Sequence, residues 1–475
     1  MIDINNVTYT YNVTDAMGKR VERIALKNFS LNVKEGQVVV LTGGSGCGKS
    51  TVLRLINGLI PHYFAGELHG DVKVNNINVS TNPIYDTAKI VGTVFQNPKN
   101  QFFNVDSTSE LAFNAENFGR NPDMIINDID RVSSWMNLNP LIDRSMFELS
   151  GGEKQKIACA SIAVADTPII VLDEPTSNLD ARGIEKLRKV IALWKKQKKT
   201  IIIAEHRLYF LKGLADRVLI LKDGEIKKKM NGTVFDALSI AETTKLGLRA
   251  VNIEKISDKV RAITAKRTLG KRYISIENLE YVYPDGEHGI SRKKLDIPTG
   301  AIVCIVGDNG KGKSTLAKCL CGLNKKAKGR VIYDTKQLPL RNMLEHCFMV
   351  MQDVNYQLFT ESVNDEIQLS VDSKIEEECV NKSNEAMKML DIEDLPKLHP
   401  MALSGGQKQR VALACAVASS KEILILDEPT SGLDYYHMIE VARVLKMLTD
   451  NNRTVIVITH DIELVNECAD YVIEM

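Results

Sequence analysis

Two glycine-rich segments of the chain carry a lysine and a hydroxyl group at the spacing that binds a phosphate chain. GGSGCGKST occupies residues 43–51 and GDNGKGKST residues 307–315, each directly after a short apolar run. Glycines let such a loop wrap closely around phosphates with its backbone N–H groups pointing inward. Lys49 and Lys313 are placed to reach the β- and γ-phosphates, and the serine after each lysine can offer its hydroxyl to Mg²⁺. The sequence therefore predicts two sites for ATP and Mg²⁺.

Every residue of the two loops is a candidate nucleotide contact, because the whole loop encloses the phosphates. These residues are Gly43, Gly44, Ser45, Gly46, Cys47, Gly48, Lys49, Ser50 and Thr51 in the first loop and Gly307, Asp308, Asn309, Gly310, Lys311, Gly312, Lys313, Ser314 and Thr315 in the second. One such match could arise by chance, but two matches followed by the same later motifs predict two nucleotide sites.

An Asp-Glu pair ends a second apolar run in each half of the chain. IIVLDE places Asp173 and Glu174 there, and ILILDE places Asp427 and Glu428. We expect the aspartates to be linked to Mg²⁺. Successive side chains of a strand point to opposite faces, and a glutamate at this position can polarise the water that attacks the γ-phosphate. Alone, D-E-P-T would indicate an acidic turn, but beside a phosphate loop it predicts hydrolysis.

The elements that must hold these residues can be predicted from the spacing of apolar residues. Runs such as VVVL, IIVL and IIIA in the first half, and AIVCIV, ILIL and VIVI in the second, are typical of parallel strands covered on both faces. Stretches between them, such as ARGIEKLRKVIALWKKQ, have helical spacing and a polar face. Strands that alternate with helices predict an α/β fold with a mainly parallel core sheet in each half.

All the motifs occur twice and in the same order, which indicates a duplicated domain. LSGGEKQKIA returns as LSGGQKQRVA, and DEPTSNLD returns as DEPTSGLD. We predict a first domain at residues 1–235, a linker at 236–272 and a second domain at 273–475. The later part of the linker is basic with little apolar periodicity, which favours a solvated connection with some helix.

Composition excludes several classes of protein. The 475 residues are 44% hydrophobic and 25% charged with a net charge of +1, which is ordinary for a globular protein and gives no support to nucleic-acid binding. No apolar run approaches the ~18 residues of a membrane helix, and the first residues do not resemble a secretory signal. The nine cysteines form no C-x-x-C pair, so we expect buried thiols in a reducing compartment rather than a metal site.

The LSGG motif between the phosphate loop and the Asp-Glu pair resembles the signature of the ATP-binding-cassette family. The resemblance covers both halves and leaves out only the linker. It implies that each domain also has an antiparallel β subdomain and a small helical subdomain. It further implies that the signature binds the γ-phosphate held by the opposite half, at a helix N-terminus that favours anions. The signature residues are Ser150, Gly151, Gly152, Ser404, Gly405 and Gly406.

The same resemblance implies further site residues. Gln96 and Gln352 are similar to the glutamines that touch Mg²⁺ and sense a membrane partner, and His206 and His460 to the histidines that act in hydrolysis with Glu174 and Glu428. Tyr11 and Tyr283 match the position that stacks on adenine, with ordinary strand packing as the alternative. The implied Mg²⁺ ligands are Ser50, Gln96, Asp173, Ser314, Gln352 and Asp427.

Because both halves retain every catalytic position, we predict two hydrolysing sites, formed when the two halves of one chain pair around ATP. A tether of this kind raises the effective concentration of one half for the other to about millimolar. His206 lies in AEHR, whereas His460 lies in the more usual THD. This difference can tune the two sites unequally.

The stretch after each glutamine is a candidate contact for a partner. FQNPKNQFFN matches MQDVNYQLFT, so that Phe103 corresponds to Phe359 and, further on, Glu110 to Glu366. An exposed aromatic residue beside an acid suits a groove for a partner helix that carries an arginine. The alternative is local packing with a solvated acid.

These stretches, with GLIPHYFAGELHGDVKVNN, resemble the ATPases of energy-coupling-factor transporters. The resemblance implies an importer of a vitamin or transition-metal ion, peripheral on the cytoplasmic face of the membrane, with a membrane coupling protein and a small substrate-binding membrane protein as partners. Fused sugar-importer ATPases are the closest alternative. A tandem-cassette translation factor would carry a longer charged arm between its domains, and a DNA-repair cassette protein would carry zinc-type cysteine pairs or coiled-coil insertions.

Overall fold

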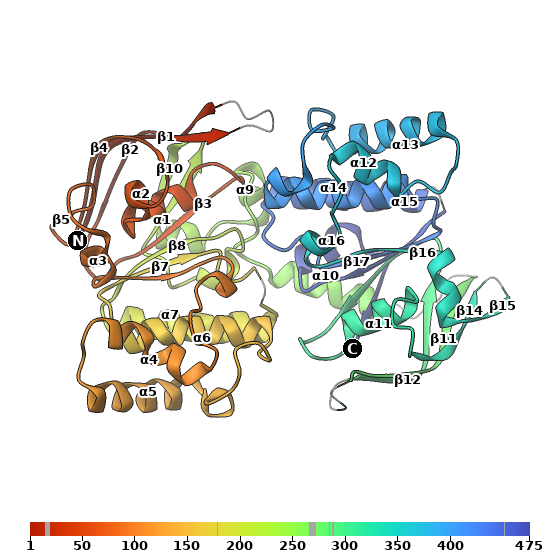
Figure 1. The fold of residues 1–475 in the computed structure, drawn as a ribbon, viewed down its shortest axis with the longest axis horizontal. Helices are drawn as coiled ribbons and strands as arrows, with labels where there is room; N and C mark the ends of the chain where they lie inside the picture. The colour runs from red at the N-terminus through yellow and green to blue at the C-terminus, as the bar shows by residue number, and fades with distance from the viewer. Residues whose placement is uncertain are drawn as a thin grey trace. The chain divides into compact units, whose positions relative to one another are not determined.

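A computed structural model describes residues 1–14, 20–177, 179–265, 272–284, 286, 289–333, 335–450 and 452–475. The chain forms two compact units, Met1–Ile253 and Glu254–Met475 (Figure 1). The division between them falls inside the predicted linker at 236–272, of which residues 266–271 lie outside the described part.

The first unit is built on a six-stranded sheet in the order β10-β9-β3-β8-β7-β6. All neighbouring strands are parallel except β10, which forms an antiparallel hairpin with β9. The strands are β3 (Val38–Gly43), β6 (Val91–Val94), β7 (Ile169–Asp173), β8 (Thr200–Ala204), β9 (Arg217–Lys222) and β10 (Glu225–Asn231).

Both faces of this sheet are buried, which explains its unbroken apolar runs. In β3, Val39 and Leu41 face a core shared with the helix after the phosphate loop, whereas Val38 and Val40 face a second core shared with α6 and α7. The helices of the unit are α1 (Lys49–Ile56), α2 (Leu59–His62), α3 (Ile84–Ala88), α4 (Ser107–Asn117), α5 (Pro122–Met136), α6 (Gly151–Ala165), α7 (Ala181–Lys196), α8 (Gly232–Asp236) and α9 (Ile240–Lys245).

Two smaller parts complete the first unit. An antiparallel sheet in the order β2-β1-β4-β5 consists of β1 (Ile2–Thr14), β2 (Arg20–Val33), β4 (Gly66–Val74) and β5 (Ile77–Asn78). A helical part is formed by α4 and α5, which pack on each other and on α6. In Figure 1 the antiparallel sheet and the helical part lie on opposite sides of the core sheet of this unit.

The second unit repeats this plan. Its parallel sheet has the order β16-β17-β18-β13-β19, and its antiparallel sheet the order β12-β11-β14-β15. The strands are β11 (Tyr273–Val282), β12 (Gly289–Pro298), β13 (Ile302–Val306), β14 (Lys328–Tyr333), β15 (Lys336–Pro339), β16 (Cys347–Val350), β17 (Ile423–Asp427), β18 (Thr454–Ile458) and β19 (Tyr471–Glu474). The predicted α/β fold with antiparallel and helical subdomains is confirmed in both units.

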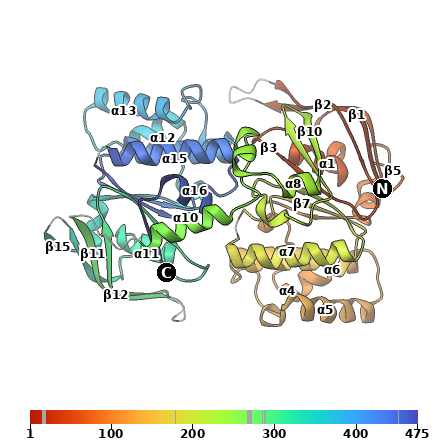
Figure 2. The same cartoon turned by 180° about the vertical axis from the view of Figure 1, so that it is seen from behind.

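The first helix of the second unit, α10, precedes the antiparallel sheet of that unit in the chain. Within this unit α10 packs on α16 and β19 (Figure 2). The helices are α10 (Glu254–Ala265), α11 (Lys313–Leu320), α12 (Val363–Leu369), α13 (Glu376–Met389), α14 (Gly405–Ala418), α15 (Tyr435–Asp450) and α16 (Ile462–Cys468). Across the residues that the structure describes, no helix combines the length and the apolar character needed to cross a bilayer.

Candidate nucleotide-binding sites

Each phosphate loop joins the end of a buried core strand to the start of a helix. In the first unit Gly43 ends β3 with φ 140°, and a Cβ there would come 2.1 Å from the carbonyl oxygen of Leu221 on β9. In the second unit Gly307 has φ 146°, and its Cβ would come 2.4 Å from the carbonyl oxygen of Met475. Both positions therefore require glycine, and the loops turn directly into the N-termini of α1 and α11, where anions bind favourably.

The two loop lysines lie over their own loops in the same way. Lys49 Nζ donates to the carbonyl oxygens of Gly43 and Gly44 at 3.1 and 3.0 Å. Lys313 Nζ donates to those of Gly307 and Asp308 at 2.7 and 2.8 Å. Both lysines are buried. Each ammonium group is thus held inside the concave loop, where it can bind a phosphate.

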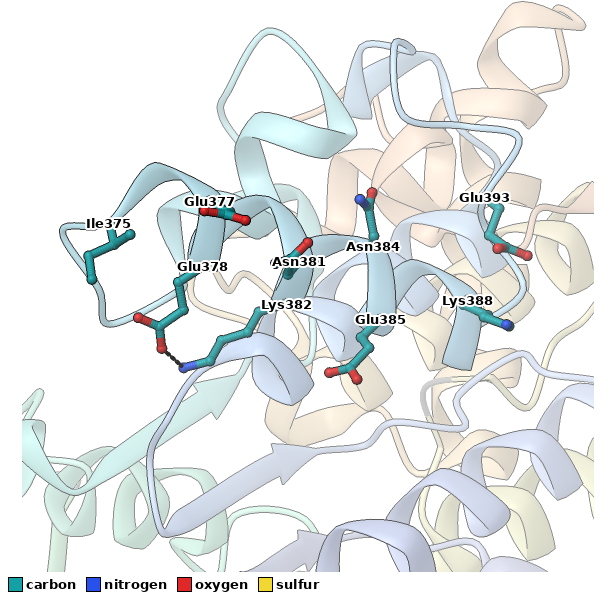
Figure 3. Close-up of a pocket in the computed structure, with 9 residues that line it drawn as sticks. All are labelled: Ile375, Glu377, Glu378, Asn381, Lys382, Asn384, Glu385, Lys388 and Glu393. Carbon is teal, nitrogen blue, oxygen red and sulfur yellow. Dashed lines mark ion pairs between the residues drawn. The ribbon is translucent and has the colours of Figure 1, made fainter.

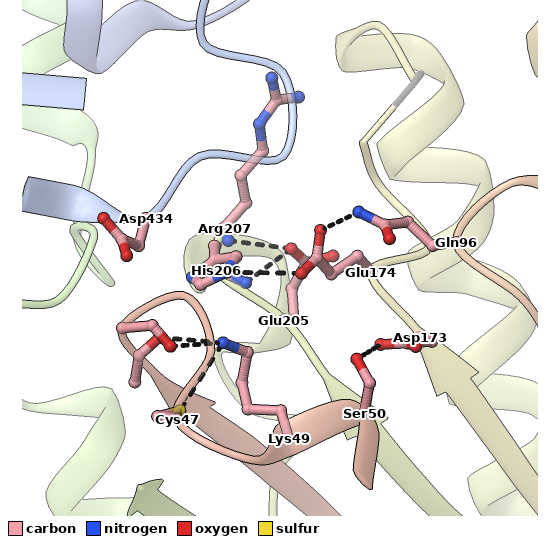
Figure 4. Close-up of polar contacts among 12 residues, drawn as sticks. Cys47, Lys49, Ser50, Gln96, Asp173, Glu174, Glu205, His206, Arg207 and Asp434 are labelled. Carbon is pink, nitrogen blue, oxygen red and sulfur yellow. Dashed lines mark hydrogen bonds and ion pairs between the residues drawn. The ribbon is translucent and has the colours of Figure 1, made fainter. Parts of the chain in front are cut away.

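A serine and an aspartate meet beside each loop and could hold Mg²⁺. Ser50 Oγ donates to Asp173 Oδ1 at 3.1 Å (Figure 4). Burial and the charge of Glu174 raise the pKa of Asp173 to about 6, while the Ser50 hydrogen bond opposes the shift. In the second unit burial raises the pKa of Asp427, whose Oδ1 is a buried oxygen without a hydrogen-bond donor. Carboxylate and hydroxyl oxygens of this kind are hard ligands that fit a Mg²⁺ ion.

Glu174 is held from several directions in the first unit (Figure 4). Its backbone has φ 43°, a left-handed conformation uncommon for glutamate, and its N–H donates to the carbonyl oxygen of Ala204 at 2.8 Å. Gln96 Nε2 donates to Glu174 Oε2 at 2.7 Å, and His206 Nε2 lies 3.4 Å from Glu174 Oε1. Burial opposes ionisation, but His206, Lys49 and Gln96 outweigh it and lower the pKa of Glu174. The carboxylate is therefore kept ionised, as a general base needs to be.

Glu428 adopts the same backbone conformation with different neighbours. It has φ 50°, and its N–H donates to the carbonyl oxygen of Ile458 at 2.8 Å. His460 Nε2 lies 3.4 Å from Glu428 Oε1 and also 2.8 Å from Oδ1 of Asn309, a residue of the phosphate loop. Thr459 Oγ1 donates to Glu428 Oε2 at 3.3 Å. The histidine of the second unit thus bridges its glutamate and its phosphate loop.

The signature motifs begin long helices. Ser150 caps α6 and Ser404 caps α14, each in a reciprocal capping box with the residue three positions later. Among the described residues, a Cβ added to Gly151 or Gly405 would meet no atom within 4 Å. Packing within the units therefore does not require these glycines. Gly152 and Gly406 follow in the first turn of each helix.

The tyrosines predicted to stack on adenine lie close to the phosphate-loop helices. The hydroxyl of Tyr11 is 3.3 Å from Thr51 Oγ1, and that of Tyr283 is 3.2 Å from Thr315 Oγ1. Arg54, which sequence reasoning missed, donates to the Tyr11 hydroxyl at 3.0 Å. The structure thus places both tyrosines at equivalent positions beside the phosphate-loop helices.

Gln96 and Gln352 each follow the edge strand of a core sheet by two residues, and both are exposed. Beyond them, the predicted aromatic residues Phe103 and Phe359 are 75% and 74% exposed. These positions are compatible with a contact to another molecule.

The acids next to these aromatic residues do not lie where the sequence predicts them. Glu110 and Glu366 are buried, 3% and 4% exposed, and do not face solvent. Glu110 Oε2 accepts from the backbone N–H groups of Phe103 and Asn104 at 3.0 and 2.9 Å. Glu366 Oε2 likewise accepts from residues 359 and 360, both at 2.9 Å. These acids hold the loop that carries the aromatic residue, so the predicted pairing with a partner arginine is wrong.

A second carboxylate near each glutamate was missed by the sequence analysis. Thr176 Oγ1 donates to Glu205 Oε2 at 2.7 Å, and Thr430 Oγ1 donates to Asp461 Oδ2 at 2.8 Å. Glu205 precedes its histidine, whereas Asp461 follows it. The difference between AEHR and THD in the sequence was the signal that could have shown that the carboxylate lies on opposite sides of the two histidines.

A surface hollow lies apart from these sites (Figure 3). It runs along α13, where Lys382 pairs with Glu378 at 3.0 Å. The lining is charged and polar and shares no residue with the predicted sites: Ile375, Glu377, Glu378, Asn381, Lys382, Asn384, Glu385, Lys388 and Glu393.

Comparisons with known proteins agree with the two repeated sites. The family model described as "ABC transporter" matches residues 26–177 and again 290–431. A Treponema denticola protein named as an ABC transporter ATP-binding protein is 41% identical over 469 residues, which cover 98% of this chain and 93% of the relative. A protein of the same designation from Caldanaerobacter subterraneus is 32% identical and is covered to 89%. The solved structure of an RNase-L inhibitor shares the fold, with a TM-score of 0.66 at 21% identity over 99% of this chain and 87% of that one.

Proposed function

We propose that this chain, which belongs to the ABC transporter family of ATP-binding proteins, is the ATP-hydrolysing subunit of an importer of the energy-coupling-factor type. Membership of the family implies two cassettes that bind and hydrolyse ATP. The observation that carries the proposal further is the presence in each unit of a complete set of phosphate-binding and hydrolytic side chains, followed by an exposed aromatic loop.

In this proposal each unit supplies the chemistry from its own residues. Glu174 and Glu428 orient the attacking water and take its proton, and His206 and His460 hold the two glutamates in place. Lys49 and Lys313 bind the phosphates. Mg²⁺, when bound at each site, would neutralise charge on the β- and γ-phosphates, and three predicted oxygen ligands in each unit would hold it: Ser50, Gln96 and Asp173 in the first, and Ser314, Gln352 and Asp427 in the second.

We further propose that each ATP is enclosed by the phosphate loop of one half and the signature of the other. The open space at Gly151 and Gly405 supports this, because packing within the units does not require glycine at either position. In the same proposal the domains span 1–235 and 273–475, joined by the segment at 236–272. ATP then favours the closed pair, since it contacts both halves only in that state.

In this proposal the membrane partners bind at the loops of Phe103 and Phe359, and the chain works at the cytoplasmic face of the membrane. Each aromatic ring is exposed on a loop that a buried acid holds in place. A preformed apolar contact of this kind loses little entropy when a partner helix docks. The proposed partners are a membrane coupling protein and one or more small substrate-binding membrane proteins.

The test is to tag the chain, solubilise membranes of its native cells and identify the co-purified proteins by mass spectrometry. We expect one shared coupling protein together with small, very hydrophobic proteins. Phe103→Ser combined with Phe359→Ser should reduce their recovery at unchanged ATPase activity of the isolated chain. Tyr85→Ser, which removes an aromatic residue that is 60% exposed outside these loops, is the matched control. Recovery of ribosomal proteins without any membrane protein would overturn the transport function and leave the ATPase standing.

A further inference from the structure

We propose that Glu205 is a positioning residue of the first site. It precedes His206 and has the same function as Asp461, which follows His460 in the second site. The inference deepens the proposed function and rests on it, because it assumes that Glu174 and His206 act in hydrolysis.

Glu205 connects the two segments that carry the proposed catalytic pair. The segments are the turn after β7, with Glu174 and Thr176, and the end of β8, with His206. Glu205 Oε2 accepts from Thr176 Oγ1 at 2.7 Å and from Thr176 N–H at 3.3 Å. Its other oxygen, Oε1, accepts from the backbone N–H groups of His206 and Arg207 at 2.7 and 3.0 Å. One carboxylate thus fixes the spacing between both segments.

Glu205 is 2% exposed and has no role in binding phosphate or in the proposed proton transfer. A buried carboxylate is costly unless hydrogen bonds compensate for its lost hydration. Its hydrogen bonds with His206 and Arg207 (Figure 4) and those with Thr176 all hold the backbone of the site. The geometry therefore indicates a residue that acts through Glu174 and His206 and not on the nucleotide.

In the second unit the equivalent connection comes from the residue after the histidine. Asp461 Oδ2 accepts from Thr430 Oγ1 at 2.8 Å, and Asp461 Oδ1 accepts from the N–H groups of Glu463 and Leu464 at 3.2 and 3.3 Å. Thr459, at the position of Glu205, donates instead to Glu428. The threonine of the D-E-P-T turn thus donates to a carboxylate in each unit. This carboxylate belongs to the residue before the histidine in the first unit and to the residue after it in the second.

The local fold changes along with the carboxylate. Asp461 is the N-cap of α16, whereas Arg207 cannot accept the hydrogen bonds of a helix N-terminus. The equivalent stretch of the first unit forms only the short 3₁₀ turn Tyr209–Leu211. Arg207 Nη1 instead donates to the carbonyl oxygen of Leu179 at 3.4 Å. The exchange is therefore a coupled change at two positions, one on each side of the histidine, and not a single neutral substitution.

The experiment moves the carboxylate across the histidine in each unit and measures steady-state ATP hydrolysis of the full chain. In the first unit the variants are Glu205→Thr alone, Glu205→Thr with Arg207→Asp, and Glu205→Thr with Arg207→Ala as the control that removes the arginine without supplying a carboxylate. In the second unit they are Asp461→Ala alone and Asp461→Ala with Thr459→Glu. Binding of a fluorescent ATP analogue and the melting temperature report whether each variant is folded.

We expect each single substitution to lower kcat by up to about twofold, because one of two sites is impaired, with KM for ATP unchanged. The moved carboxylate should restore most of the lost kcat, and the alanine control should not. A purely structural carboxylate would change the melting temperature without this pattern of kcat loss and rescue.

Two results would overturn the inference: full kcat in both single variants, or swapped pairs as slow as their single variants in both units. Failure of the proposed function is distinguishable, because an unmodified chain that does not hydrolyse ATP contradicts the ATPase itself before any variant is compared.

Discussion

The two ATP sites of this chain share their backbone and differ in what holds their side chains. Glu174 and Glu428 both adopt a left-handed conformation after a core strand, and both lie 3.4 Å from a histidine. Around Glu174 the additional contact is Gln96, whereas His460 in the second site also contacts Asn309 of the phosphate loop. Motifs of the same spacing therefore specify where the chain runs, while the side chains around each glutamate determine the hydrogen bonds of the proposed catalytic groups.

The loops that carry the exposed aromatic residues show the opposite behaviour. Glu110 and Glu366 bind the backbone of their loops through the same oxygen at nearly the same distances. The exposed aromatic loop is thus built alike in both units, and the surroundings of the two glutamates are not. We expect mutations in the loops to have equal effects in the two halves and mutations around the glutamates to have unequal ones.

The largest effect is expected from removing both proposed bases. Glu174→Gln with Glu428→Gln should lower kcat by about 10²–10⁴-fold, because the amide cannot accept the proton of the attacking water. ATP binding should persist, since Lys49 and Lys313 remain. Steady-state hydrolysis and binding of a fluorescent ATP analogue check this. Turnover at the wild-type rate would remove both carboxylates from the mechanism, and the two single variants would show how far each half depends on its own glutamate.

The next effect concerns the buried acids of the loops. Glu110→Ala or Glu366→Ala leaves two backbone N–H groups without their charged acceptor, which should destabilise each loop by about 1.5–3 kcal/mol. Hydrogen exchange of the amides of residues 103–104 and 359–360 measures this locally. Glu116→Ala, at an exposed position of α4, is the control. Protection unchanged in both variants would contradict the structural role of the acids, and a loss confined to one half would break the similarity of the two loops.

Much of this arrangement could be predicted from the sequence, because it depends on local spacing. The glycine pattern of each loop, the apolar runs before it and the order of motifs suffice to place Lys49 beside Asp173 at the carboxyl edge of a parallel sheet. Burial of Glu110 could not be predicted in this way, since it depends on a loop folding back over its own helix. The same holds for Asn309 and His460, which are far apart in the chain and meet only through the sheet order.

The smallest effect should separate the two sites most clearly. Gln96→Ala removes a hydrogen bond to Glu174, and Asn309→Ala removes one to His460. A typical hydrogen bond contributes about 0.5–1.5 kcal/mol net, so we expect losses of kcat of roughly twofold to tenfold, with Gln96→Ala acting in the first site and Asn309→Ala in the second. The measurement is kcat in chains that also carry Glu428→Gln or Glu174→Gln. Equal losses of kcat in both backgrounds would show that the two sites are tightly coupled and would contradict the assignment of each substitution to one site.

The position of the second carboxylate, before His206 in one unit and after His460 in the other, restricts how the two halves could have diverged. Passing from one arrangement to the other by single substitutions requires an intermediate with no carboxylate at the threonine or an intermediate with two. The first leaves buried hydrogen-bond donors unsatisfied, and the second places like charges together in a buried site. Neither route is neutral, so the effect of each substitution depends on the other having occurred. Each half is therefore expected to keep its own position of the carboxylate in descendants. Recombination that exchanges single residues between the two copies within the gene would then be selected against.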